Sequence, residues 1–156
     1  MIAKKVNCTI MDFNSVSAQI MSQFDTVVFG GRFHAGRVDG LQKAKKMFVR
    51  SGAGRLIVFA TGATPNVAVA MVEEAWKNNF TPAELKSIPH FYMQSDLRYE
   101  CMSFGDKLMM KAFAWMMRKK KDKNEYEKSF EKAISSSYDI SPEEYIIPLL
   151  SCLDTK

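Results

Sequence analysis

Short, continuous apolar runs are the clearest pattern in the first half of the chain. Residues 26–29 and 56–60 are two such runs, and a glycine-containing segment follows each of them. Runs of this length are typical of strands that are buried on both faces of a sheet. Residues 90–93 predict a third buried strand, and residues 8–11 predict a shorter one near the start.

Segments with helical periodicity separate and follow these runs. Residues 41–50 place their apolar side chains on one helical face, and residues 67–79 carry a second apolar stripe. Thr81 and Glu84, with Pro82 between them, predict the capped start of a short helix. The spacing predicts further helices over residues 103–120, 125–136 and 142–153.

The order of these elements predicts the fold class. Short strands that alternate with helical crossovers form an open parallel sheet with helices on both faces. The 156 residues contain no repeat and no linker, which favours a single α/β domain over residues 1–156. Residues 103–156 form its α-helical C-terminal part.

Composition excludes several classes of protein. The chain is 47% hydrophobic and 25% charged, which is the balance of a folded domain and not of a disordered one. No apolar run approaches the roughly 20 residues that a membrane-spanning helix needs. The first residues have no apolar signal segment, and Cys8, Cys101 and Cys152 form no close pair. We therefore expect free thiols and a cytoplasmic protein.

The net charge of +5 is local. Four of the five charges come from one basic segment that surrounds Asp122, namely Arg118, Lys119, Lys120, Lys121 and Lys123. One segment of this kind does not predict specific nucleic-acid binding. It is either the solvated end of a helix or a peripheral contact with anionic lipid headgroups or an acidic partner.

Two glycine-containing segments follow the first two buried strands. Ligands of open parallel sheets bind at the carboxyl ends of the strands, and glycine lets the backbone approach a flat ligand. The alternative is that these glycines only permit tight turns. The candidate binding residues are Gly30, Gly31, Arg32, Phe33, His34, Ala35 and Gly36 in the first segment, and Thr61, Gly62, Ala63 and Thr64 in the second.

Other sites are not indicated. The chain has no phosphate-loop motif, and its two histidines with three scattered cysteines do not predict a metal site. His34 is either a proton donor in the first segment or an exposed loop histidine. Trp76 and Trp115 fall in helical stripes, which favours core positions for both. No catalytic residue is identified.

Residues 26–36 (TVVFGGRFHAG) and 56–65 (LIVFATGATP) resemble the corresponding segments of bacterial flavodoxin-domain proteins. Residues 89–93, 97–99 and the Met-rich segment from Ser103 are similar to the branch that contains menaquinone-dependent protoporphyrinogen oxidase and its small relatives. The resemblance covers nearly the whole chain.

This resemblance implies a flavodoxin-like fold that holds FMN without a covalent bond. It implies that residues 30–36 and 61–65 flank the isoalloxazine ring. The role would be electron transfer with a redox partner protein or a quinone, and a protoporphyrinogen oxidase-like flavoenzyme is an alternative. A flavin-free interaction domain is a third hypothesis.

The chain departs from the family at its N-terminal end. Family members begin with a strand, a Ser/Thr-rich loop around the FMN phosphate and a helix, and this sequence has no such segment. The phosphate loop uses backbone N–H groups at a helix N-terminus, so its absence predicts impaired FMN binding. The absent first strand would leave an open sheet edge, which predicts pairing with another chain, for example in a homo-oligomer.

Overall fold

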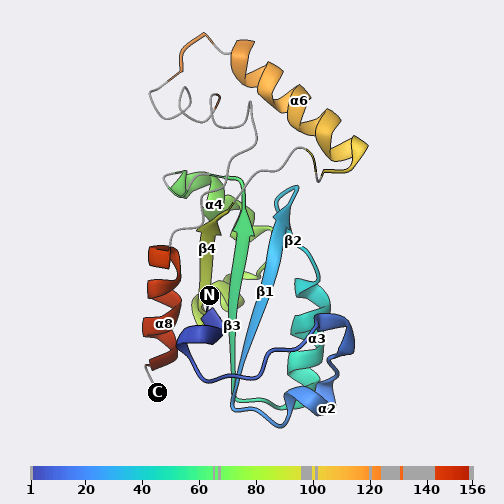
Figure 1. Ribbon diagram of the computed structural model, residues 1–156, viewed down its shortest axis with the longest axis vertical. Helices are drawn as coiled ribbons and strands as arrows, with labels where there is room; N and C mark the ends of the chain where they lie inside the picture. The colour runs from blue at the N-terminus through green and yellow to red at the C-terminus, as the bar shows by residue number, and fades with distance from the viewer. Residues whose placement is uncertain are drawn as a thin grey trace.

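The fold is a four-stranded mixed open sheet with helices packed against both of its faces (Figure 1). A computed structural model describes residues 2–64, 66, 68–95, 100, 102–119, 121–123, 131 and 143–154. The sheet order is β2-β1-β3-β4, with strands β1 (Thr26–His34), β2 (Arg37–Val38), β3 (Arg55–Gly62) and β4 (His90–Gln94). The α/β class and the three buried strands agree with the sequence pattern.

Strands β1, β3 and β4 are parallel, and β2 is the antiparallel exception. β2 pairs with β1 only through Phe33 and His34. The turn between them has positive φ at Ala35 (48°) and Gly36 (77°), the backbone of a tight two-residue hairpin. The sequence analysis placed residues 30–36 in a loop after the strand. That prediction is wrong for residues 30–34, because β1 continues to His34 before the chain turns.

One face of the sheet carries the larger core. Helices α3 (Leu41–Ser51), α4 (Val69–Lys77) and α5 (Pro82–Ser87) pack there. Leu41 and Ala44 from α3 and Trp76 from α4 are buried against alternate residues of β1 and β3, including Phe29 and Val58. This alternation follows from the pleat of a strand, which directs successive side chains to opposite faces.

The other face is covered in part by the two ends of the chain. Helix α1 (Ile2–Lys5), the 3-10 helix η3 (Glu143–Ile146) and helix α8 (Ile147–Asp154) pack there around the buried residues Ile57, Met93 and Leu149. In Figure 1, α8 runs beside β4, so residues from both ends of the chain meet on this face.

The strand predicted over residues 8–11 is wrong. Residues 7–12, which we call the N-terminal strap, are not part of any strand and are exposed. The strap ends where the Asp12 side chain accepts a hydrogen bond from the Asn14 backbone (2.8 Å) and caps the 3-10 helix η1 (Phe13–Ser15). Helix α2 (Ala18–Met21) follows and contacts α3. The short apolar run lacks a neighbouring strand to pair with among the described residues.

Helix α6 (Phe104–Lys119) lies beyond the carboxyl ends of the strands (Figure 1). Trp115 on this helix is 59% exposed, which corrects the prediction of a core position, and the Lys119 ammonium lies 3.9 Å from its ring centroid. Among the described side chains of α6, Phe104, Leu108, Trp115 and Met116 are exposed, so apolar spacing alone does not show burial on this helix. The helix predicted over residues 125–136 lies outside the described residues except for residue 131, and Lys120 lies outside them too.

The capping box at Thr81 gives a pH-dependent prediction. The Glu84 carboxylate accepts from the Thr81 N–H (2.7 Å) and from the Lys45 ammonium (2.8 Å). Desolvation raises the pKa of Glu84, but the hydrogen bonds from Lys45 and Thr81 outweigh it, so the pKa lies below its ordinary value of 4.5. A lowered pKa stabilises the fold above pH 4.5, and this contribution is lost as the pH falls through the lowered pKa.

We therefore expect Glu84→Gln to reduce stability at pH 7 and to flatten its decline between pH 5 and pH 3, the acidic range in which carboxylates gain protons. Urea unfolding at several pH values measures both effects. Glu74→Gln is the matched control, since Glu74 forms an exposed pair with Lys77 (3.2 Å). An equal effect of the two variants would contradict the assignment.

Candidate functional site

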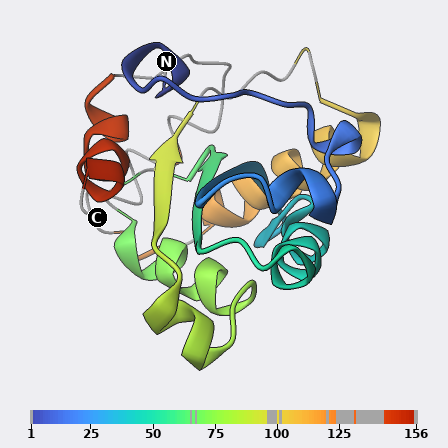
Figure 2. The ribbon, with the colours of Figure 1, turned by 90° about the horizontal axis from the view of Figure 1, so that it is seen from below.

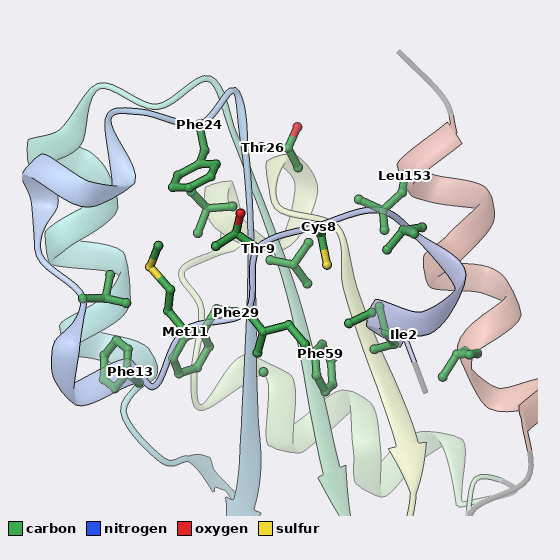
Figure 3. A pocket seen from close by; sticks show the side chains of 18 of the residues that line it. Ile2, Cys8, Thr9, Met11, Phe13, Phe24, Thr26, Phe29, Phe59 and Leu153 are labelled. Atoms are coloured by element: carbon green, nitrogen blue, oxygen red, sulfur yellow. The ribbon is translucent and has the colours of Figure 1, made fainter.

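A large apolar groove lies on the partly covered face of the sheet, with a volume of about 1070 Å³. The strap forms its outer rim and crosses over β1 and β3 (Figure 3), and Figure 2 shows the strap running from α1 to α2. Residues that line the groove include Ile2, Met11, Phe24, Val28, Phe59 and Leu153. The volume is slightly above the usual range for small-molecule sites, which ends at roughly 1,000 Å³.

The groove has two distinct ends. Its carboxyl end is lined by Gly30, Thr61, Met93, Gln94 and Ser95, where β1, β3 and β4 finish or approach their ends. The carboxyl end is where ligands of open parallel sheets bind. Its amino end is lined by Asp25, which precedes β1, and by Asp154, the last residue of α8.

The structure brings the two predicted segments to neighbouring strands. Arg32 of β1 is the register partner of Thr61 of β3, and Thr61 is in turn the partner of Met93 of β4. Gly30 and Thr61 line the groove, whereas the other nine predicted binding residues do not. The predicted site is therefore divided among the groove, the β1–β2 hairpin and the end of β3 with the residues that follow it.

Two of the predicted glycines serve close packing. A Cβ atom on Gly30 would lie 2.3 Å from the Phe59 ring, and one on Gly31 would lie 2.6 Å from a Val38 methyl group. The missing side chain at Gly30 thus lets the Phe59 ring lean over β1 and form part of the groove floor. This packing is a structural reason for both glycines that needs no ligand.

Phe33 points to the opposite face of the sheet from the groove. Its ring packs edge-on against Trp76, with centroids 4.8 Å apart, and lies 5.6 Å from the ring of Tyr92. On the same face, a Cβ atom on Gly62 would lie 3.2 Å from the Cβ of Phe33. These contacts fix the end of β1 against α4 and β4.

Polar contacts hold the carboxyl end of β1. The Arg32 guanidinium pairs with Asp39 (3.1 Å), and the His34 ring contacts the Asp106 carboxylate of α6 (3.0 Å). Hydrogen bonds from Ser103 and then from His34 lower the pKa of Asp106. The interaction of His34 with Asp106 connects the hairpin to α6.

The segment after β3 is tied to β4. The Tyr92 hydroxyl donates to the Thr64 carbonyl (2.7 Å). The Asn66 N–H donates to the Gln94 side chain, and the Gln94 N–H donates to the Asn66 side chain, both at 3.1 Å. This reciprocal pair fixes the segment that follows β3 to the end of β4.

Asn79 is a structural residue near the site that the sequence analysis did not identify. It is 3% exposed, and its side chain accepts from the Val38 N–H (2.8 Å) and donates to the carbonyls of Gly36 (2.9 Å) and Ala75 (2.6 Å). The β1–β2 hairpin is thereby held to the end of α4. No local pattern signals this role, because the partners are far apart in the sequence.

The electrostatics of the groove are simple. Asp25 and Asp154 are the charged side chains among the described residues that line it, and no Lys, Arg or His is in that set. As far as the structure describes it, the groove therefore offers an apolar surface and no cationic side chain for an anionic group. Within the described residues, no cluster of His, Cys, Asp and Glu side chains could hold a metal ion.

Comparison with known proteins found no family model that matches the chain, and no curated protein or solved structure with significant similarity to it. Among the described residues, no helix combines the length and apolarity that crossing a membrane requires.

Proposed function

We propose that the chain is a flavodoxin-like redox domain that binds the isoalloxazine ring of FMN at the carboxyl end of the apolar groove. The observation that carries the proposal is that Gly30 and Thr61, which lie on adjacent strands, both line this end of the groove. They come from the two segments that resemble ring-flanking segments of flavodoxin-domain proteins, and both line one groove with Phe59 and Met93.

The residues at this end fit the ring of FMN. Phe59 and Met93 offer apolar surface, and the Thr61 hydroxyl offers a hydrogen-bond partner for the polar edge of the ring. They fit the phosphate poorly, because no basic side chain lines the described groove. We therefore infer that the ring supplies most of the binding energy and the phosphate supplies little.

Bound FMN would supply electron transfer in one- or two-electron steps. The part of this chain is to orient the ring, to exclude water from its apolar face and to leave one edge accessible to a reaction partner. A redox protein or a quinone remains the proposed partner. The exposed surface of α6 around Trp115 and Lys119 is apolar and basic and lies beyond the same end of the sheet. We assign the contact with the redox partner to this surface.

The ring-only mode gives a direct prediction. FMN and riboflavin, which differ by the phosphate, should bind with dissociation constants within about threefold of each other. A phosphate anchor with two charge-assisted hydrogen bonds would instead favour FMN by roughly a hundredfold or more. Quenching of flavin fluorescence on titration with the protein measures both affinities.

Two controls locate the binding site. Thr61→Val removes the hydroxyl but keeps the shape, and it should weaken both flavins by about threefold to tenfold. Adenosine monophosphate, which has a phosphate but no flavin ring, should not compete. Absence of saturable binding of either flavin would reject the redox function and leave the flavin-free interaction domain as the remaining hypothesis.

A further inference from the structure

The outer edge of β1 is open along most of its length. On that side, β2 pairs with β1 only at Phe33 and His34, and no other described strand lies next to it. The Asp25 carbonyl accepts from Arg55 on the β3 side, whereas the Arg32 carbonyl accepts from Asp39 on the outer side. Because the direction of the backbone groups alternates along a strand, the N–H and C=O groups of Thr26, Val28 and Gly30 point outward.

This open edge borders the apolar groove. The side chains of Val28 and Phe59 line the groove on the same sheet face, and the wall beyond β1 is formed by apolar side chains of η1, α2 and the following turn, such as Phe13, Ile20 and Phe24. Unsatisfied backbone groups beside an apolar surface are a template for another strand. The strand would gain main-chain hydrogen bonds from β1 and bury its side chains in the groove.

We propose that this edge binds a single extended, apolar segment of a partner protein, which adds to the sheet as a strand beside residues 26–30. The walls of the groove decide between a segment and a second copy of the domain. The strap crosses over β1 and β3, and η1 and α2 lie beyond the outer edge of β1 (Figure 3), so the edge of another folded sheet would meet them before it reached β1.

Charge complementarity narrows the chemistry of the segment. Asp25 and Asp154 lie at the amino end of the groove, and the described lining has no basic side chain. Arg55 lies at this end too, but its guanidinium contacts the Cys152 sulfur (3.1 Å) and it is not part of the lining. The preferred segment therefore has β-branched residues along its length and a basic residue at the end that meets Asp25.

The test uses a synthetic peptide of the sequence Lys-Thr-Ile-Val-Ile-Val-Thr with a fluorophore at its C-terminal end. We expect saturable binding to the whole chain by fluorescence anisotropy. A peptide with proline at its two valine positions should bind at least about tenfold more weakly, because proline cannot donate to a sheet ladder. Equal binding of the two peptides would overturn the proposal.

Protein variants place the peptide at β1. Thr26→Lys puts a charge at an exposed position on the open edge and should weaken binding by about tenfold or more. Val49→Lys is the matched control, because Val49 is 79% exposed on α3 and lies outside the groove. If both variants bind the peptide as the unchanged chain does, the edge is not the site.

A second variant tests the charge. Asp25→Asn should weaken the lysine peptide by about twofold to fivefold, the usual effect of one exposed ion pair, and should not affect a peptide with threonine in place of lysine. A stable dimer that Thr26→Lys dissociates and the peptide does not would assign the edge to a second copy and overturn the proposal. Peptide binding is measured without flavin, so failure of one proposal does not decide the other.

Discussion

Replacing Asn79 by aspartate is expected to lower the free energy of unfolding by about 3–5 kcal/mol, the usual cost of an uncompensated buried charge. Asn79 is almost fully buried, and its amide donates to the carbonyls of Gly36 and Ala75. A carboxylate in this place would face two carbonyl oxygens with no proton to donate. Asn79→Ala should cost less, about 2–4 kcal/mol, because it only leaves backbone groups without partners.

Thermal unfolding followed by circular dichroism measures this effect. For a chain of this length, each kcal/mol corresponds to roughly 3 °C, so Asn79→Asp should lower the melting temperature by about 10–15 °C. The deficit should shrink at acidic pH, where the new carboxyl gains a proton that it can donate. Asn78→Asp is the control, since Asn78 is the exposed neighbour of Asn79. Similar losses for the two variants would show that the hydrogen bonds of Asn79 are not the cause.

Replacing Trp76 by alanine is expected to destabilise the fold by about 3–5 kcal/mol through loss of a buried aromatic side chain. The indole is 4% exposed and contacts the rings of Phe33, Phe80 and His90, with centroid distances of 4.8, 5.6 and 5.0 Å. It therefore joins the end of β1 to α4 and to the start of β4. Its removal leaves a cavity that these rigid rings cannot fill.

The second tryptophan provides the control. Trp115 is 59% exposed on α6, so Trp115→Ala should change the free energy of unfolding by no more than about 0.5 kcal/mol. Urea unfolding followed by circular dichroism compares the two variants with the same probe. Comparable losses would mean that α6 is a structural part of the core, contrary to its exposure.

Elements with a strong local signal could be predicted from the sequence. The buried strands gave continuous apolar runs, α3 gave a helical stripe, and α5 gave a capping box that the structure contains in full. In each case, neighbouring residues carry the information. The strand predicted from the short apolar run over residues 8–11 was wrong, because an apolar run becomes a strand only if a partner strand lies beside it.

The candidate site was predicted less well, because it depends on packing between distant residues. A Gly-Gly pair indicates a turn or a ligand contact, yet Gly30 and Gly31 are used by Phe59 and Val38, which the sequence does not place beside them. Trp115 has helical spacing, but spacing does not reveal whether anything covers that face. The groove is formed by the strap, α8 and α2, whose meeting is a property of the tertiary structure alone.

The two faces of the sheet also differ in how far apart in sequence their contacts lie. The core under α3, α4 and α5 is built from residues within one continuous stretch, whereas the other core joins Ile2, Ile57 and Leu149. Contacts of high sequence separation form slowly, because ordering them costs more chain entropy. We therefore expect the second core, which brings α1 and α8 to the edge of the groove, to form after the first core has folded.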